Sequence, residues 1–267
     1  HADGRIVDWE LNTALSAKPN RVIRYASANA TQVCVVCSDN QVIYFEYNVM
    51  TGQLNEVNRI EMQAEVTCVS LGNIPEGRSR ARFMALGCAV DKTVRLLSVN
   101  PDDCCTVVSR LACVSEPESV VVDEQPDGEM RLITGMSNGM CTWTRIDPST
   151  GELSDTRIKL LGPKPVQLVR VKLAVDETAV LALSGRSWII LNREKRRVFV
   201  PLVYDPLIHA SEFYYEQLSE GGLVAIAAQS NGELSLRVLN IDRAQLSNMF
   251  FEKRVPTLYT PRKLEIL

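Results

Sequence analysis

Apolar and polar positions follow a pattern that recurs five times along the chain. Each copy has a short apolar run, a turn of Ser, Asp, Asn or Gly, and a second apolar run. The copies are VCVVCSDNQVIYFEY (33–47), MALGCAVDKTVRLLSV (84–99), RLITGMSNGMCTWTRI (131–146), VLALSGRSWIIL (180–191) and VAIAAQSNGELSLRVL (224–239). Runs rich in β-branched and aromatic residues around such turns predict β-hairpins.

The hairpin turns recur at nearly constant intervals. Asp39, Asp91, Asn138, Gly185 and Asn231 are separated by 52, 47, 47 and 46 residues. Periods of roughly 40–50 residues are typical of propeller blades and of helical solenoids. A solenoid needs uninterrupted amphipathic stretches of about 12 residues or more, and the sequence has none. We therefore predict an all-β, WD40-like β-propeller with hairpin turns at these five positions.

Each interval leaves room for a four-stranded blade. In residues 66–112 the strands are expected, from the innermost to the outer edge, at 66–71, 81–89, 93–99 and 105–112. Four further whole blades are expected at 21–61, 117–161, 165–202 and 207–255. A half hairpin at 2–9 and the start of an inner strand at 261–267 indicate partial blades at both ends. We expect a propeller over residues 1–260, incomplete at its N-terminal side, and a closing strand or the next propeller over 261–267.

Two packing expectations follow from this arrangement. The first and last whole blades should each leave an apolar face uncovered, because neighbouring blades complete a propeller ring. Trp143 and Trp188 each follow a hairpin turn. We expect both indoles to lie between adjacent blades, where a fully buried indole would cost about 3–5 kcal/mol to replace by alanine.

Composition narrows the class of protein. Of the 267 residues, 46% are hydrophobic and 23% are charged, as in an ordinary globular chain and unlike a disordered one. No stretch of 18 residues is free of charged or turn residues, and HADGRIVDWE lacks a signal-peptide profile. The formal net charge of −3 disfavours a broad nucleic-acid surface, since such surfaces usually carry a basic excess.

The eight cysteines are expected to be reduced thiols without a metal. They are Cys34, Cys37, Cys68, Cys88, Cys104, Cys105, Cys113 and Cys141. Disulfide frameworks are typical of small secreted domains, and most of these cysteines lie in apolar runs. Cys34 and Cys37 have the spacing of a zinc or redox motif, but residues three apart in a strand point to opposite faces. No second pair of ligands completes a zinc site.

The sequence offers no catalytic constellation. His1 is terminal, and His209 is expected to be packed and hydrogen-bonded, since no Ser, Cys or carboxylate motif accompanies it. No P-loop, G-x-G-x-x-G, HExxH or G-x-S-x-G motif is present. We therefore expect no enzyme activity, no cofactor and no small-molecule substrate.

A basic run, NREKRR (192–197), stands out on a predicted hairpin edge or outer strand. Its cations are Arg193, Lys195, Arg196 and Arg197. One interpretation is a solvated turn; the other is a contact for an acidic partner or an RNA phosphate.

Several segments resemble one family of propeller proteins. GQLNEV (52–57), DPSTGELSDTR (147–157), LGPKPVQLVRV (161–171), SGRSW (184–188), YTPRK (259–263) and RFMALGCAVDKTVRLLSVNPDDC (82–104) match, in the same order, the family of the splicing factor 3b propeller subunit. The large subunits of the damage-specific DNA-binding protein and of the cleavage and polyadenylation specificity factor share its architecture and are more distant from these segments.

The resemblance implies a fold of three seven-bladed propellers, of which this chain would be most of the second, lacking about one and a half blades at its front. It also implies a nuclear, non-catalytic scaffold of the U2 snRNP that supports branch-site recognition. Its partners would be the helical-repeat and small subunits of splicing factor 3b, pre-mRNA indirectly, and a histone-acetyltransferase coactivator. The segment after Val122 (DEQPDGEMRL) is shorter than the family's usual loop. The alternatives are an adaptor propeller of a cullin ubiquitin ligase, or of the 3′-end cleavage factor.

Overall fold

The computed structural model describes residues 21–74, 77–125, 127–174, 177–193, 196–202, 206–213, 222–228, 233–241 and 250–255. These residues form five antiparallel sheets of four strands each, and the strands within each sheet pair in chain order. The β-propeller fold expected from the repeat is confirmed. No helix in these residues is long and apolar enough to cross a membrane.

Each sheet is one blade, numbered here in chain order. Blade 1 consists of β1 (Ile23–Ala28), β2 (Gln32–Cys37), β3 (Gln41–Asn48) and β4 (Gln53–Glu61). Blade 2 consists of β5 (Val66–Leu71), β6 (Phe83–Cys88), β7 (Thr93–Ser98) and β8 (Val107–Ala112), with the short 3-10 helix η1 (Pro101–Asp103) between β7 and β8. Blade 3 consists of β9 (Pro117–Glu124), β10 (Met130–Met136), β11 (Met140–Ile146) and β12 (Leu153–Leu160). Blade 4 consists of β13 (Gln167–Ala174), β14 (Glu177–Leu183), β15 (Trp188–Arg193) and β16 (Arg196–Pro201). Blade 5 consists of β17 (Leu207–Phe213), β18 (Gly222–Ala228), β19 (Leu234–Ile241) and β20 (Phe250–Val255).

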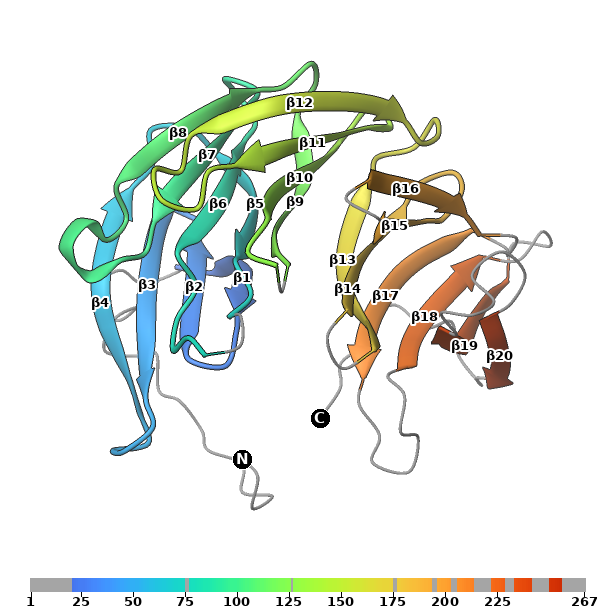
Figure 1. Ribbon diagram of the computed structural model, residues 1–267, viewed down its shortest axis with the longest axis horizontal. Coiled ribbons are helices and arrows are strands. Elements are labelled where there is room, and N and C mark those ends of the chain that lie inside the picture. Colours follow the sequence, from blue (N-terminus) through green and yellow to red (C-terminus); the bar gives the residue numbers. More distant parts are fainter. Residues whose placement is uncertain are drawn as a thin grey trace.

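The five blades follow one another along an arc (Figure 1). The first strand of each blade lies on the concave side, and the inner strands of successive blades contact one another, β1 with β5, β5 with β9, β9 with β13 and β13 with β17. The fourth strand of each blade lies on the convex side (Figure 1). This order, from the innermost strand to the outer edge, is the one expected from the sequence.

The core lies between blades. Four clusters of buried apolar side chains in the described residues each join successive blades, from blades 1 and 2 to blades 4 and 5. The second strands β6 and β10 are therefore buried along their whole length, because a neighbouring blade covers each face. The outer strands β8 and β12 are mostly exposed or half-buried.

The predicted turns fall between the second and third strands of blades 1 to 4. Asp39, Asp91, Asn138 and Gly185 each lie between these two strands, as expected. The fifth turn residue, Asn231, lies outside the described residues, as do the half hairpin at 2–9 and the segment 261–267.

The expected uncovered face of blade 1 is only partly present. Its inner strand β1 is exposed, with Ile23 and Tyr25 each more than one third accessible. The expectation is wrong for the rest of the face turned away from blade 2, where Cys37 and Ile43 are completely buried.

The two tryptophans lie where the repeat predicted, but their burial is incomplete. Trp143 of blade 3 and Trp188 of blade 4 pack against one cluster between these blades. Each is half-buried rather than fully buried. The indole N–H of Trp188 donates to the carbonyl of Leu161 at 2.9 Å.

Candidate interaction site

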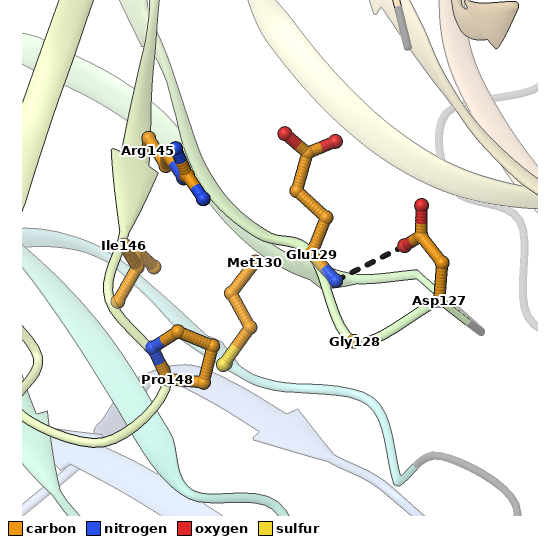
Figure 2. A pocket seen from close by; sticks show the side chains of 7 residues that line it. All are labelled: Asp127, Gly128, Glu129, Met130, Arg145, Ile146 and Pro148. Carbon is orange, nitrogen blue, oxygen red and sulfur yellow. Dashed lines mark hydrogen bonds between the residues drawn. The ribbon is translucent and has the colours of Figure 1, made fainter. Parts of the chain in front are cut away.

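A small pocket lies at one end of blade 3. The β9–β10 turn contributes Asp127, Gly128 and Glu129, and the strand ends contribute Met130, Arg145, Ile146 and Pro148, around a volume of about 270 Å³. The turn closes tightly, because Glu129 N–H donates to Asp127 Oδ1 at 3.0 Å and Gly128 N–H donates to the Gln125 carbonyl at 2.9 Å. Figure 2 shows the apolar side chains to one side and the two carboxylates to the other.

The pocket is suited to binding a side chain rather than to covalent chemistry. Its volume lies just below the range of small-molecule pockets, roughly 300–1,000 Å³. The lining holds carboxylates and the exposed guanidinium of Arg145, but no Ser, Cys or His. The carboxylate of Glu129 is already paired with Arg131. A nucleophile with an adjacent base, which acyl or phosphoryl transfer would need, is absent from this lining.

The pocket was not predicted from the sequence. The P-D-G residues at 126–128 are a turn signal, and they lie in the segment noted as shorter than the family's usual loop. The pattern of apolar and polar positions does not show that Arg145 of β11 and Pro148 of the following turn lie beside these residues. Blade 2 helps to hold Pro148 in place, because Arg82 donates to the Pro148 carbonyl at 2.8 Å.

Side-chain hydrogen bonds join blade 4 to the adjacent blade 3 and to the non-adjacent blade 2. Arg170 of β13 donates through Nη2 to the Val122 carbonyl of blade 3 at 2.7 Å and to the Leu71 carbonyl of blade 2 at 3.1 Å. Thr178 of blade 4 donates to buried Asp123 at 3.2 Å. Charge-assisted bonds of this kind are among the stronger hydrogen bonds in proteins, so they tie blades 2, 3 and 4 together.

Glu124 is a buried carboxyl at the same end of β9. Burial raises its pKa above the ordinary glutamate value, and the cations of Arg78 and Arg82 oppose this rise. Arg78 Nη1 lies 3.6 Å from Glu124 Oε1. The main chain of Glu124 is held by Asn73 of blade 2, which exchanges hydrogen bonds of 2.6 and 2.7 Å with it. The arrangement joins blade 2 to blade 3.

The predicted basic run lies at the β15–β16 hairpin. Arg193 ends β15 and pairs with Arg196, the first residue of β16, while Arg197 pairs with Asn192. Lys195 lies outside the described residues. The backbone therefore places three of the four cations at the end of an outer strand pair, as the sequence indicated.

The histidine prediction is wrong in one respect. His209 lies on the inner strand β17 as expected, but its side chain is exposed rather than packed. The other histidine, His1, lies outside the described residues.

Cys34 and Cys37 do diverge as strand geometry requires. Cys34 faces the cluster shared with blade 2, and Cys37 faces the opposite side of blade 1. All eight cysteines are free thiols, and the described residues hold no group of three or more His, Cys, Asp or Glu placed to bind a metal ion.

Comparison with known proteins assigns the family. A family model described as the RSE1/DDB1/CPSF1 second beta-propeller matches residues 3–238. The chain belongs to this family. It is 39% identical over 279 residues to a zebrafish (Danio rerio) protein named Splicing factor 3B subunit 3, and 37% identical over 269 residues to the Emericella nidulans protein named Pre-mRNA-splicing factor rse1. These alignments cover 99% and 98% of the chain, which spans about a fifth of each relative, 22% and 21%.

A solved structure supports the fold independently. A crystal structure of BBS1N in complex with ARL6DN matches 84% of this chain and 64% of its own chain, with a TM-score of 0.55 and 16% identity. At that identity the match concerns the propeller architecture alone.

Proposed function

We propose that the chain is the second-propeller segment of a splicing factor 3b subunit 3, with residues 1–260 in that propeller and 261–267 beginning the next propeller or closing the ring. In this proposal it is a nuclear, non-catalytic scaffold in the U2 snRNP that supports branch-site recognition. The single observation that carries the proposal is 39% identity to the zebrafish splicing protein over 99% of the chain.

The physical character of the molecule suits a scaffold. Interblade clusters and the hydrogen bonds of Arg170 to two other blades hold the concave side in one arrangement. Turns such as Asp127–Glu129 then present side chains from fixed positions. A rigid body with surface turns is how propellers offer contacts to several partners.

The test is affinity purification of the full-length protein that contains this segment, tagged at one end and recovered from nuclear extract of its own cells. We expect co-recovery of the helical-repeat and small subunits of splicing factor 3b together with U2 snRNA, with pre-mRNA recovered through the particle. A histone-acetyltransferase coactivator would be a second assembly. Recovery of a cullin, or of 3′-end cleavage subunits, without U2 snRNA would refute the proposal in favour of another family role.

The basic hairpin is proposed as a contact within that assembly for an acidic protein surface or an RNA phosphate. The triple variant Arg193→Glu, Arg196→Glu, Arg197→Glu should lower recovery of one partner or of U2 snRNA severalfold. Arg110→Glu, Arg157→Glu, Arg186→Glu is the matched control, because these three exposed arginines lie on blades 2, 3 and 4 and give the same change in charge. Equal recovery with both variants would leave the hairpin as a solvated turn.

A further inference from the structure

Two consecutive cysteines form a strained turn at the junction of blades 1 and 2. Cys104 has φ −54° and ψ 132°, Cys105 has φ 63°, and Thr106 N–H donates to the Asp103 carbonyl at 3.1 Å. These values define a type II turn with Cys105 at the position that glycine usually takes. A non-glycine residue there holds a left-handed backbone conformation that L-residues rarely adopt.

The turn is held from both sides. Asn58 of blade 1 donates to the Cys104 carbonyl at 2.7 Å, and Cys105 N–H donates to the Ser98 carbonyl at 2.8 Å. Cys105 is buried in the cluster shared by blades 1 and 2, whereas Cys104 packs at the edge of that cluster and remains partly exposed. The backbone of the turn is therefore held on both sides, and Cys104 is the more accessible of the two thiols.

Their separation fits a shared bridging atom better than a direct bond. The two Sγ atoms lie 3.7 Å apart. Consecutive Cα atoms are about 3.8 Å apart, which is short of the roughly 4.4–6.8 Å usual for disulfides. A central atom with two bonds to sulfur of about 2.3 Å, at angles of about 90–110°, holds the sulfurs about 3.3–3.8 Å apart.

We infer that Cys104 and Cys105 form a dithiol site for a trivalent, thiophilic centre such as an organoarsenic(III) compound. A structural zinc ion takes four protein ligands, and the described residues place no third His, Cys, Asp or Glu to hold a metal ion with these two. A trivalent arsenic that keeps one organic substituent needs only two sulfurs, which is what the turn supplies.

The exchange balances without a redox step. An arsonous acid, R–As(OH)₂, loses both hydroxides as its two As–O bonds break. Two As–S bonds form, and the two thiol protons leave with the hydroxides as two molecules of water. Burial raises the pKa of both thiols above the ordinary cysteine value. Protonated thiols are poor ligands for a metal cation, but they supply the protons that this exchange consumes.

The test uses phenylarsine oxide on the reduced 267-residue chain in the presence of a phosphine reductant. Intact-mass spectrometry should show one phenylarsenic unit per chain, retained against excess monothiol and removed by a dithiol. The variants Cys104→Ser and Cys105→Gly should each weaken retention by about a hundredfold or more, because loss of one sulfur removes the intramolecular second bond. Glycine at position 105 also relieves the positive φ, so that variant should keep its fold.

Cys113→Ser is the matched control, since Cys113 is a partly exposed thiol like Cys104 but lies elsewhere on blade 2. It should retain the label unchanged. Absence of a retained label on the parent chain would overturn the inference. So would undiminished retention in both turn variants while they remain folded by circular dichroism, or loss of the label in Cys113→Ser.

Discussion

Gly139→Ala tests how closely the β10–β11 turn of blade 3 packs on the linker to blade 4. Gly139 has φ 83°, and a Cβ at this position would lie 1.7 Å from the Gly162 carbonyl oxygen and 2.8 Å from its carbonyl carbon. The linker cannot easily withdraw, because Leu161 N–H donates to the Gly139 carbonyl at 3.0 Å. Added methyl groups in tight packing cost about 1–3 kcal/mol, sometimes more.

Gly128→Ala is the matched control. Gly128 has φ 82°, nearly the same backbone conformation, but nothing lies within 4 Å of a Cβ built on it. It therefore reports the left-handed backbone penalty alone, about 1–2 kcal/mol. Gly139→Ala adds the collision with backbone, so we expect a total loss of about 2–5 kcal/mol.

Urea unfolding followed by far-ultraviolet circular dichroism measures both losses, with midpoints compared at equal slope. Gly139→Ala should lose at least about 1 kcal/mol more than Gly128→Ala. Equal losses would refute the reasoning, since they would mean that the Gly162 carbonyl does not pack against the turn or moves away without cost.

Three further predictions use the same unfolding assay. Trp188→Ala should lower the free energy of unfolding by about 2–3 kcal/mol, less than the loss for a fully buried indole. Trp188→Phe should lower it by about 1 kcal/mol, because it removes only the hydrogen bond to Leu161; identical losses would contradict this. Arg170→Met should lower the free energy of unfolding by about 2–3 kcal/mol, because it breaks charged hydrogen bonds to two blades. The exposed control Arg145→Met should stay within about 0.5 kcal/mol of the parent; an Arg170→Met variant as stable as the parent would be the contrary result. Burial raises the pKa of Glu124, so the folded state binds its proton more tightly than the unfolded chain does. The contribution of this carboxyl to folding stability is therefore fully present below its unfolded-state pKa and is lost as the pH rises through its folded-state pKa. Glu124→Gln should flatten this decline as the pH rises above the ordinary glutamate pKa, with the exposed Glu118→Gln as the control. An unchanged slope in Glu124→Gln would count against the assignment.

The strand layout was predictable because it depends on local chemistry repeated at a fixed interval. Asp39, Asp91 and Asn138 are residues that tolerate tight-turn backbone angles, and each stands between two apolar runs. The register of a blade follows from this alternation, since a slip of one residue would turn every apolar side chain to the wrong face. Blade 3, expected at 117–161, accordingly begins at Pro117 and ends its last strand at Leu160.

What the sequence could not supply depends on contacts between blades. The hydrogen bond of the Trp188 indole depends on a carbonyl at residue 161, and the exposure of His209 depends on which face of β17 is covered. The pocket at Asp127–Glu129 needs Pro148 to be drawn in by an arginine of another blade. Periodicity carries no information about such meetings between distant residues.

The reach of Arg170 has a consequence for how the molecule comes apart. In ordinary repeat proteins each unit touches only its nearest neighbours, so unfolding spreads one unit at a time, like a one-dimensional chain of switches. Arg170 couples blade 4 to blade 2 as well as to blade 3. Second-neighbour coupling penalises the opening of a single interior blade. The amides of β5, β9 and β13 should then exchange with solvent through one shared opening event rather than three. A mechanical force applied to blade 4 would be transmitted directly to blade 2.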